Sequence, residues 1–344
     1  MSAMSWVVWR QYRAQAAIAG ALLAAFAVLM LVTGVQVASQ WHAALIACSA
    51  NHTCGNLADS LFLGSHAIGF LVIMTLGVPA VLGMLLGAPL LAYEFESGTS
   101  QYAWTQSVTR RRWLVAKSGW LLLAAAAVGG VVSGLVTWWS GPDNALQGDA
   151  FKPGRFDIMG IVPVGYAVFA VALGITAGAL LRRTLPAIGI TLAGFIVVRM
   201  VIYGWLRAHF AAPVTTYFSL AQGLFTAAGS SWQLAAGYAG ANGQPISLPQ
   251  SVNGPVIGGS AAVPGLPVSS LPAQCQAAAG NGPLTPATYH AVLSCAQAHG
   301  IRGYLTYQPA SRYWAFQGIE TGIFVLLAAA LLAVTFTVIS RRDG

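Results

Sequence analysis

Six long apolar stretches constrain the fold of this chain more than any other feature. They cover residues 14–38, 66–92, 118–139, 158–181, 185–206 and 315–339. Each has about 20 residues or more, which at 1.5 Å of helix rise per residue is enough to cross a hydrocarbon core ~30 Å thick. Inside them only Arg199 and Glu320 carry a charge. The sequence therefore predicts an all-α polytopic membrane protein with six transmembrane helices.

The composition excludes most soluble classes of protein. Of the 344 residues, 57% are hydrophobic and only 7% are charged, whereas a soluble domain is roughly 25% charged. A secreted mini-protein, a disordered tail and a nucleic-acid binder are all incompatible with these values. The first apolar stretch is long, follows an amphipathic segment and lacks a cleavage site, so we interpret it as a span and not as a signal peptide.

The basic residues predict the orientation in the membrane. Ten of the sixteen bases flank the spans on one side, namely Arg10, Arg13, Arg110, Arg111, Arg112, Lys117, Arg182, Arg183, Arg341 and Arg342. Short cytoplasmic segments carry such an excess of Lys and Arg. Both termini are therefore predicted to be cytoplasmic.

All four cysteines fall on the predicted outer side. Cys48 and Cys54 lie in the first outer loop, and Cys275 and Cys295 lie in the long loop before the last span. Four cysteines allow three pairings, of which we favour the two local disulfides, because disulfides persist on an oxidising face. A metal site remains an alternative at the first pair, which His42 and His52 flank.

The stretch between the fifth and sixth spans has three parts. Residues 209–238 are apolar and aromatic but too short to cross, which predicts re-entrant or interfacial helices. Residues 240–272 are rich in Gly, Pro and Ser and predict a loose loop. Residues 285–299 predict a short helix with Thr285 as its cap and Pro286 in its first turn. One face of that helix would carry Tyr289, Val292, Leu293 and Ala296.

No catalytic or nucleotide-binding motif is present in the sequence. Neither Lys117 nor Lys152 has the glycines of a phosphate-binding loop. The H-E-x-x-H and G-x-S-x-G patterns and a carboxylate pair within a span are missing as well. We therefore predict that this chain is not an enzyme, has no catalytic residue or metal ion, and binds no cofactor itself.

The predicted cytoplasmic loop at 93–113 is unusual for this chain. It contains Glu94 and Glu96, two of only eight acids. Thr99 or Ser100 could cap a short helix that carries Tyr102, Trp104 and Val108, a face suited to docking a partner. The alternative is that the glutamates are solvated and that Arg110, Arg111 and Arg112 only anchor the topology.

Two further features concern the membrane itself. Trp6, Trp9, Arg10 and Arg13 recur at helical spacing, which predicts an interfacial helix at 1–13 or an extension of the first span. Arg199 and Glu320 enter neighbouring spans from the same side, and intramembrane charges usually pair. We therefore predict one buried Arg199–Glu320 ion pair, with a structural or a gating role.

Two segments resemble the permease subunits of bacterial ABC type 2 exporters. The first contains the runs E-F-E-S-G-T at 94–99 and W-T-Q-S-V-T-R at 104–110, followed by residues 113–117. The second covers residues 307–314 and continues through Phe316, Gln317, Ile319 and Glu320. The resemblance in layout extends over the whole chain.

The resemblance implies a complete architecture. It implies a connecting helix at 1–13, five spans within 14–206, a coupling loop at 93–113, an extracellular region with re-entrant segments at 207–314, and a last span with a cytoplasmic tail at 315–344. It also implies two copies of a separate ATPase, which bind ATP and Mg, and a second permease protomer. The ATPase-docking residues would be Glu94, Glu96, Gly98, Thr99, Tyr102, Trp104 and Arg110.

The resulting functional hypothesis is outward transport through a bacterial cell membrane by alternating access. The spans lack clusters of one charge, so an apolar or amphipathic small molecule, lipid or peptide is the expected substrate, as in multidrug or antibiotic efflux. The alternative is a non-transporting transmitter or assembly protein in which an ATPase drives a change in the outer domain. A continuous cavity between protomers would distinguish the exporter from the transmitter.

Overall fold

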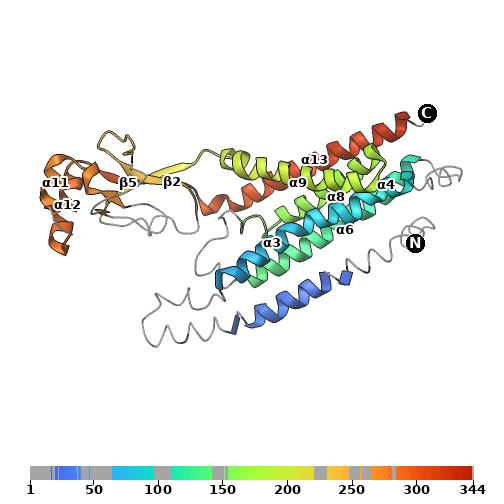
Figure 1. Ribbon diagram of the computed structural model, residues 1–344, viewed down its shortest axis with the longest axis horizontal. Coiled ribbons are helices and arrows are strands. Elements are labelled where there is room, and N and C mark those ends of the chain that lie inside the picture. Colours follow the sequence, from blue (N-terminus) through green and yellow to red (C-terminus); the bar gives the residue numbers. More distant parts are fainter. Residues whose placement is uncertain are drawn as a thin grey trace. The chain divides into compact units, whose positions relative to one another are not determined.

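The computed structural model describes residues 17, 20–21, 23–36, 38–39, 46, 64–96, 110–141, 151, 154–220, 231–247, 256–257, 265–280 and 284–342. The chain divides into two compact units (Figure 1). The helical unit comprises Met1–Leu146, Pro153–Phe210 and Trp314–Gly344. The second unit comprises Gln147–Lys152 and Ala211–Tyr313.

The helical unit consists of long apolar helices, two of which contain a π-helical turn. Its elements are α3 (Gly64–Leu82), η1 (Gly83–Gly87, π), α4 (Ala88–Glu96), α6 (Arg110–Trp139), α8 (Val162–Leu181), α9 (Thr184–Val201), η3 (Ile202–Leu206, π), η4 (Arg207–His209, 3-10) and α13 (Tyr313–Arg342). Residues 23–36 form a further apolar helix. The described parts of the chain therefore confirm a mostly helical, polytopic membrane protein.

Five helices in the described ranges are long and apolar enough to cross a membrane. They cover Ile73–Glu96, Arg112–Trp139, Val162–Leu181, Thr184–His209 and Ala310–Arg341. These five correspond in order to the second to sixth predicted spans. The first predicted span, 14–38, is described only in part, as the shorter apolar helix Leu23–Gln36.

Helix α8 lies at the centre of the helical unit. Its most apolar window is 72% buried, against at most 44% for the other four candidate spans. It packs against α3, η1, α4, α6 and α9, and Figure 1 shows it running beside α4 and α6. Its residues are almost all small or aliphatic, so neighbouring helices can approach it on every side.

Four glycines bring α8 into backbone contact with the turn between α3 and α4. Gly83 and Gly87 in η1 are four residues apart, as are Gly174 and Gly178 in α8. A Cβ atom added to Gly83 would lie 2.5 Å from the carbonyl oxygen of Ala170. One added to Gly178 would lie 2.5 Å from the carbonyl oxygen of Ala88. Small residues at four-residue spacing allow such close helix crossings in membranes.

The second unit contains an antiparallel sheet where the sequence predicts re-entrant helices. Strands β1 (Val214–Phe218), β2 (Trp232–Ala239) and β5 (Arg302–Gln308) pair in the order β1-β5-β2. The prediction of re-entrant or interfacial helices at 209–238 is therefore wrong for the segments that form β1 and β2. The apolar, aromatic and uncharged sequence suggested the membrane, but runs such as V-T-T-Y-F are β-branched and aromatic, which favours a strand.

Two short α-helices, two 3-10 turns and a two-stranded ribbon are the other elements of this unit in the described residues. They are β3 (Val256–Ile257), β4 (Leu266–Pro267), η5 (Val268–Ser270), α11 (Ala273–Ala279), α12 (Pro286–Ala298) and η6 (Ala310–Arg312). Their buried residues and the sheet form one core, which includes Leu266, Val292, Ala296 and Leu305. Part of the loop predicted at 240–272 is thus ordered against this core.

The predicted helix at 285–299 is confirmed together with its cap. The Thr285 hydroxyl accepts a hydrogen bond from the Thr288 backbone N–H, and the Thr288 hydroxyl accepts one from the Thr285 N–H. Pro286 occupies the first turn. This capping box satisfies two N–H groups that the helix itself leaves without partners. The predicted face packs against the core of the unit, with Val292, Leu293 and Ala296 buried and Tyr289 partly buried.

The close crossing at η1 predicts that Gly83→Ala destabilises the helical unit. The added methyl group meets a backbone carbonyl that cannot rotate away, so we expect a loss of about 1–3 kcal/mol in the free energy of unfolding. Gly119→Ala in α6 is the matched control, because nothing lies within 4 Å of its added Cβ. Thermal unfolding in detergent should show a lower midpoint for Gly83→Ala only. Equal midpoints would contradict the close packing.

The capping box predicts that Thr285→Ala weakens α12 by about 1 kcal/mol, the usual contribution of an N-cap side chain. Hydrogen–deuterium exchange of the α12 amides should become faster. Ser294→Ala is the control within the same helix, because its exposed hydroxyl only bonds back to the Ala291 carbonyl. If the two variants exchange alike, the cap does not stabilise the helix.

Candidate functional site

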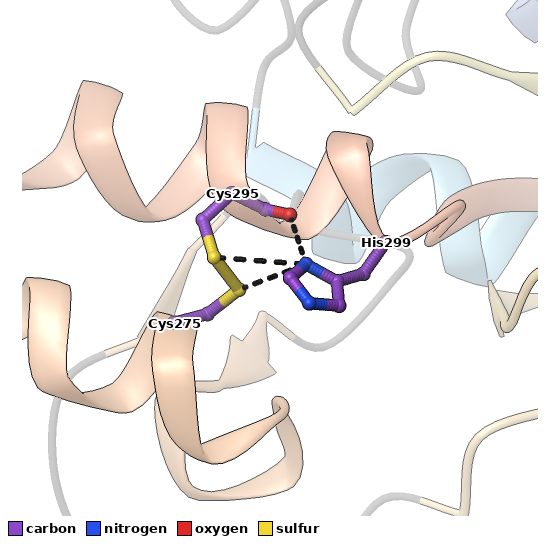
Figure 2. A group of neighbouring side chains, drawn as sticks. All are labelled: Cys275, Cys295 and His299. Carbon is purple, nitrogen blue, oxygen red and sulfur yellow. Dashed lines mark hydrogen bonds between the residues drawn. A yellow bond between two sulfur atoms is a disulfide. The ribbon is translucent and has the colours of Figure 1, made fainter.

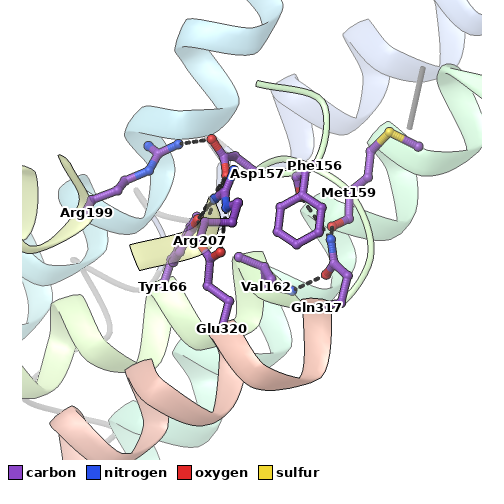
Figure 3. A network of polar contacts seen from close by, with 9 residues as sticks. All are labelled: Phe156, Asp157, Met159, Val162, Tyr166, Arg199, Arg207, Gln317 and Glu320. Atoms are coloured by element: carbon purple, nitrogen blue, oxygen red, sulfur yellow. Dashed lines mark hydrogen bonds and ion pairs between the residues drawn. The ribbon is translucent and has the colours of Figure 1, made fainter. Parts of the chain in front are cut away.

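The strongest polar feature of the helical unit is a buried ion pair between Arg207 and Glu320. The Arg207 Nε donates to Glu320 Oε2 at 2.7 Å, and Arg207 Nη2 donates to Glu320 Oε1 at 2.7 Å. Each residue is 1% exposed. Figure 3 shows Glu320 rising from α13 toward the Arg207 guanidinium. Bidentate pairing of this kind gives strong, directional hydrogen bonds.

Asp157 and Tyr166 extend this pair into a network. Asp157 Oδ1 accepts a second hydrogen bond from Arg207 Nη2. The Tyr166 hydroxyl lies 2.6 Å from Glu320 Oε1 and 3.1 Å from Asp157 Oδ1. It has a single proton, which the nearer carboxylate oxygen accepts. The turn before α8, α8 itself, η4 and α13 are thus joined through four buried side chains.

Arg199 joins the network through Asp157 and not through Glu320. Its Nη2 donates to Asp157 Oδ2 at 3.1 Å, and its side chain is 16% exposed. The predicted Arg199–Glu320 pair is therefore replaced by two pairs, Arg199–Asp157 and Arg207–Glu320. The physical reason is that the helix of the fifth span continues through η3 and η4 beyond Leu206, which brings Arg207 into the bundle.

The network is balanced in charge and covered by aromatic rings. It holds two carboxylates and two guanidinium groups. The guanidinium carbon of Arg207 lies 4.5 Å from the centre of the Phe156 ring, and that of Arg199 lies 5.0 Å from the centre of the Tyr166 ring. Each lies within the range of a cation–π contact. Because a charge left alone in such a place costs several kcal/mol, the arrangement is stable only when it is complete.

Gln317 fixes the turn that carries Asp157. Its side-chain Oε1 accepts hydrogen bonds from the backbone N–H groups of Ile161 and Val162, both at 2.9 Å. Its Nε2 donates to the carbonyl oxygens of Phe156 and Met159 at 3.0 and 3.2 Å. A residue of α13 therefore caps the first turn of α8, whose N–H groups have no partner within the helix.

The opposite end of α8 faces the residues predicted to dock an ATPase. Glu94, at the end of α4, is 7% exposed and forms an ion pair with Lys117 of α6. Glu96 Oε2 accepts hydrogen bonds from the Thr184 N–H at 3.1 Å and from its hydroxyl at 2.8 Å. Glu94 is thus buried and paired, which overturns the alternative that both glutamates are solvated. Glu94 and Glu96 tie α4 to α6 and to the start of α9.

Of the other predicted docking residues, the structure describes Arg110 alone. Arg110 is the first residue of α6. Gly98, Thr99, Tyr102 and Trp104 lie outside the described residues. Their docking role stays a prediction.

The structure confirms the Cys275–Cys295 disulfide, which joins α11 to α12 (Figure 2). The His299 ring lies beside it, with Nδ1 2.9 Å from the Cys295 carbonyl oxygen and Nε2 2.9 Å from Gln274 Oε1. In the described part of the chain, these two cysteines and His299 form the one cluster with the spacing of a metal site. Both sulfurs are bonded to each other and offer no thiolate, so we interpret the group as a covalent staple. Cys48 and Cys54 lie outside the described residues.

Sequence reasoning missed Asp157, Tyr166 and Gln317 and assigned Arg207 to a loop. Asp157 and Arg207 each fell one residue outside a predicted span, at 158–181 and 185–206. A usable signal was present, because both charges adjoin spans on the side where Arg199 and Glu320 enter the membrane. Tyr166 carries no charge and gave no comparable signal, and Gln317 was noted only as part of the segment that resembles the exporter permeases.

The geometry predicts strong coupling between Arg207 and Glu320. Glu320→Ala leaves the Arg207 charge buried with one carboxylate fewer, so we expect a loss of about 3–5 kcal/mol in the free energy of unfolding. Arg207→Met/Glu320→Ala removes both charges and should lose less than the sum of the two single variants. A double-mutant cycle followed by unfolding in detergent measures this coupling.

Arg199→Gln provides the comparison for this cycle. Arg199 is partly exposed, and its replacement leaves Asp157 paired with Arg207. The coupling energy between Arg199→Gln and Glu320→Ala should therefore be smaller than that between Arg207→Met and Glu320→Ala. If Arg199 couples to Glu320 more strongly than Arg207 does, the pairing described here is wrong.

A comparison with known proteins gives one match. No curated protein and no solved structure matches the chain. The model of a protein family described as "ABC-2 membrane transporter related" matches residues 20–207. That range contains α3 to η3 and ends at Arg207, and it is more than half of the chain. The protein belongs to the ABC-2 membrane transporter related family.

Proposed function

We propose that this chain is the membrane-spanning permease subunit of an ATP-driven exporter. The family match over 20–207 carries the proposal, because this range supplies most of the candidate spans. The sequence contains no phosphate-binding loop. ATP hydrolysis is therefore assigned to a separate ATPase subunit, which holds the ATP and Mg, while this chain forms the path through the bilayer.

The proposed assembly has two permease protomers, taken as identical, and two ATPases. It lies in a bacterial plasma membrane with both termini on the cytoplasmic side, as the distribution of basic residues predicts. The ATPase docks on the loop at 93–113, between α4 and α6. The Glu94–Lys117 and Glu96–Thr184 contacts support this assignment, since they would pass a displacement of that loop to α6 and α9.

The proposed cargo is an apolar or amphipathic small molecule, lipid or peptide that moves outward by alternating access. The exposed faces of the candidate spans are apolar, with Leu123, Val197 and Leu326 among their most exposed residues. The buried charges of the network are balanced in sign, so the helical unit has no excess charge there to attract a highly charged cargo.

A transmitter function is the second candidate. In this case an ATPase would use the helical unit to act on the second unit without transport. The observation that favours it is that residues 211–313 have a core and a disulfide of their own, which a simple connecting loop does not need.

Co-purification from native membranes tests the permease assignment. A gently solubilised, tagged chain should bring a soluble ATPase with it. Tyr102→Ala/Trp104→Ala should reduce the amount of ATPase recovered at least about tenfold, because aromatic anchors often carry most of the binding free energy. Trp120→Ala is the control, since it removes an exposed aromatic side chain of α6 outside the loop.

The outcomes separate the two candidates. ATP-dependent uptake of amphipathic dyes into inverted vesicles would favour the exporter. ATPase recovery with no such transport would favour the transmitter. If no ATPase is recovered under conditions that preserve other transporter complexes, the permease assignment is wrong.

A further inference from the structure

A cavity of about 400 Å³ lies in the helical unit between α3 and α9. Most of its lining is apolar, with Leu76, Gly77, Leu192, Ile196 and Met200 among the contributing residues. Asp157 and Arg199 also line it. We call this cavity the α3–α9 groove. The groove thus combines an apolar surface with Arg199, the partly exposed residue of the charge network.

Of the two charged residues that line the groove, Arg199 has the free hydrogen-bonding capacity. Both oxygens of Asp157 accept hydrogen bonds, Oδ1 from Arg207 and Oδ2 from Arg199. Asp157 is only 3% exposed. Arg199 uses Nη2 for Asp157, and its other donors make no hydrogen bond within the part of the chain that the structure describes. An anion would meet free guanidinium donors there, whereas a cation would meet no free carboxylate oxygen.

Binding an anion would leave the rest of the network intact. Asp157 keeps its contacts with Arg207 and Tyr166 when Arg199 turns its remaining donors to a ligand. A charge-assisted hydrogen bond to a carboxylate or phosphate is roughly twice as strong as a neutral one.

The walls of the groove fit an alkyl chain. Met200 is 64% exposed and Ile196 is 45% exposed, and both line the groove. Gly77 has nothing within 4 Å of an added Cβ atom, so its side of the groove is open. The ligand must therefore combine an apolar body with one anionic end, which is the structure of a single-chain amphiphile.

The depth of Arg199 distinguishes such a molecule from a lipid of the surrounding bilayer. Arg199 precedes His209, the last residue of the candidate span Thr184–His209, by ten residues. At 1.5 Å per residue it lies about 15 Å from that end of the helix, which is about 10 Å inside a hydrocarbon core ~30 Å thick that is centred on this span. The phosphates of bilayer lipids stay in the headgroup region outside the hydrocarbon core. A ligand whose charge reaches Arg199 must enter the groove.

We propose that the α3–α9 groove binds a single-chain amphipathic anion, with its carboxylate or phosphate on Arg199 and its alkyl chain along α3 and α9. This inference rests on the proposed function only in treating the ligand as cargo. It narrows the cargo from apolar or amphipathic molecules to amphipathic anions. The binding itself requires no ATPase.

Native mass spectrometry of the full chain in a neutral detergent tests the proposal. Dodecyl phosphate and dodecyltrimethylammonium are the probes, since they share one chain length and differ in the sign of the charge. We expect one dodecyl phosphate per chain, bound at least about tenfold more tightly than the cation, as loss of a charged hydrogen bond predicts. Arg199→Gln should abolish this preference.

Two further variants separate binding from folding. Gly77→Leu fills the groove and leaves every charge in place, so it should weaken dodecyl phosphate binding about as much as Arg199→Gln does. Arg341→Gln, which removes an exposed charge near the end of α13, should bind like the unaltered chain. Unfolding midpoints of all variants show whether each remains folded.

Three outcomes would overturn the proposal. The first is equal binding of the two probes, and the second is dodecyl phosphate binding that neither Arg199→Gln nor Gly77→Leu weakens. The third is displacement of dodecyl phosphate by an equal concentration of phosphatidylglycerol, which would assign the groove to a bilayer lipid. None of these results bears on ATPase co-purification, so the proposed function is tested separately.

Discussion

The helical unit depends on the bidentate pairing of Arg207 with Glu320. Taking both ions out of water costs several kcal/mol each, and their mutual attraction and hydrogen bonds offset that cost. Asp157 and Tyr166 add further polar contacts to the pair, and Gln317 holds the turn that presents Asp157. Because these residues come from α8, its preceding turn, η4 and α13, the pairing fixes three helices at one end with a precision that apolar contacts alone do not give.

Close backbone packing, and not a charge network, holds the other half of the bundle together. There the backbones of η1 and α8 meet through glycines, so dispersion contacts over a short distance replace charge. Glu94–Lys117 and Glu96–Thr184 add polar contacts near the loop at 93–113. The two ends therefore resist deformation in different ways: a charge network has a few discrete arrangements, whereas a close glycine crossing allows small sliding. This contrast is compatible with the proposed docking of an ATPase at the end that carries the loop at 93–113.

The spans were predictable from the sequence because each depends on a local property, a run of apolar residues longer than the hydrocarbon core. The α12 helix was predictable for a similar reason, since Thr285 and Pro286 mark its start. The sheet was not, because β1 and β5 are 84 or more residues apart and an uncharged aromatic strand has the composition of a membrane segment. The Arg207–Glu320 pair was missed because Arg207 falls one residue beyond the predicted span 185–206, and a span boundary is not defined to a single residue by hydropathy.

The position of Gln317 and Glu320 in the chain has a consequence for biosynthesis. Tyr166 bonds to Glu320, which follows it by 154 residues, and the N–H groups at the start of α8 bond to the side-chain amide of Gln317 in α13. During synthesis α8 and α9 enter the membrane while Arg207 still lacks its principal counter-ion. The membrane must therefore hold an incomplete set of charges until the last helix is inserted. A nascent chain that stops before α13 carries an uncompensated cation, a mark by which membrane quality control can distinguish unfinished molecules from finished ones.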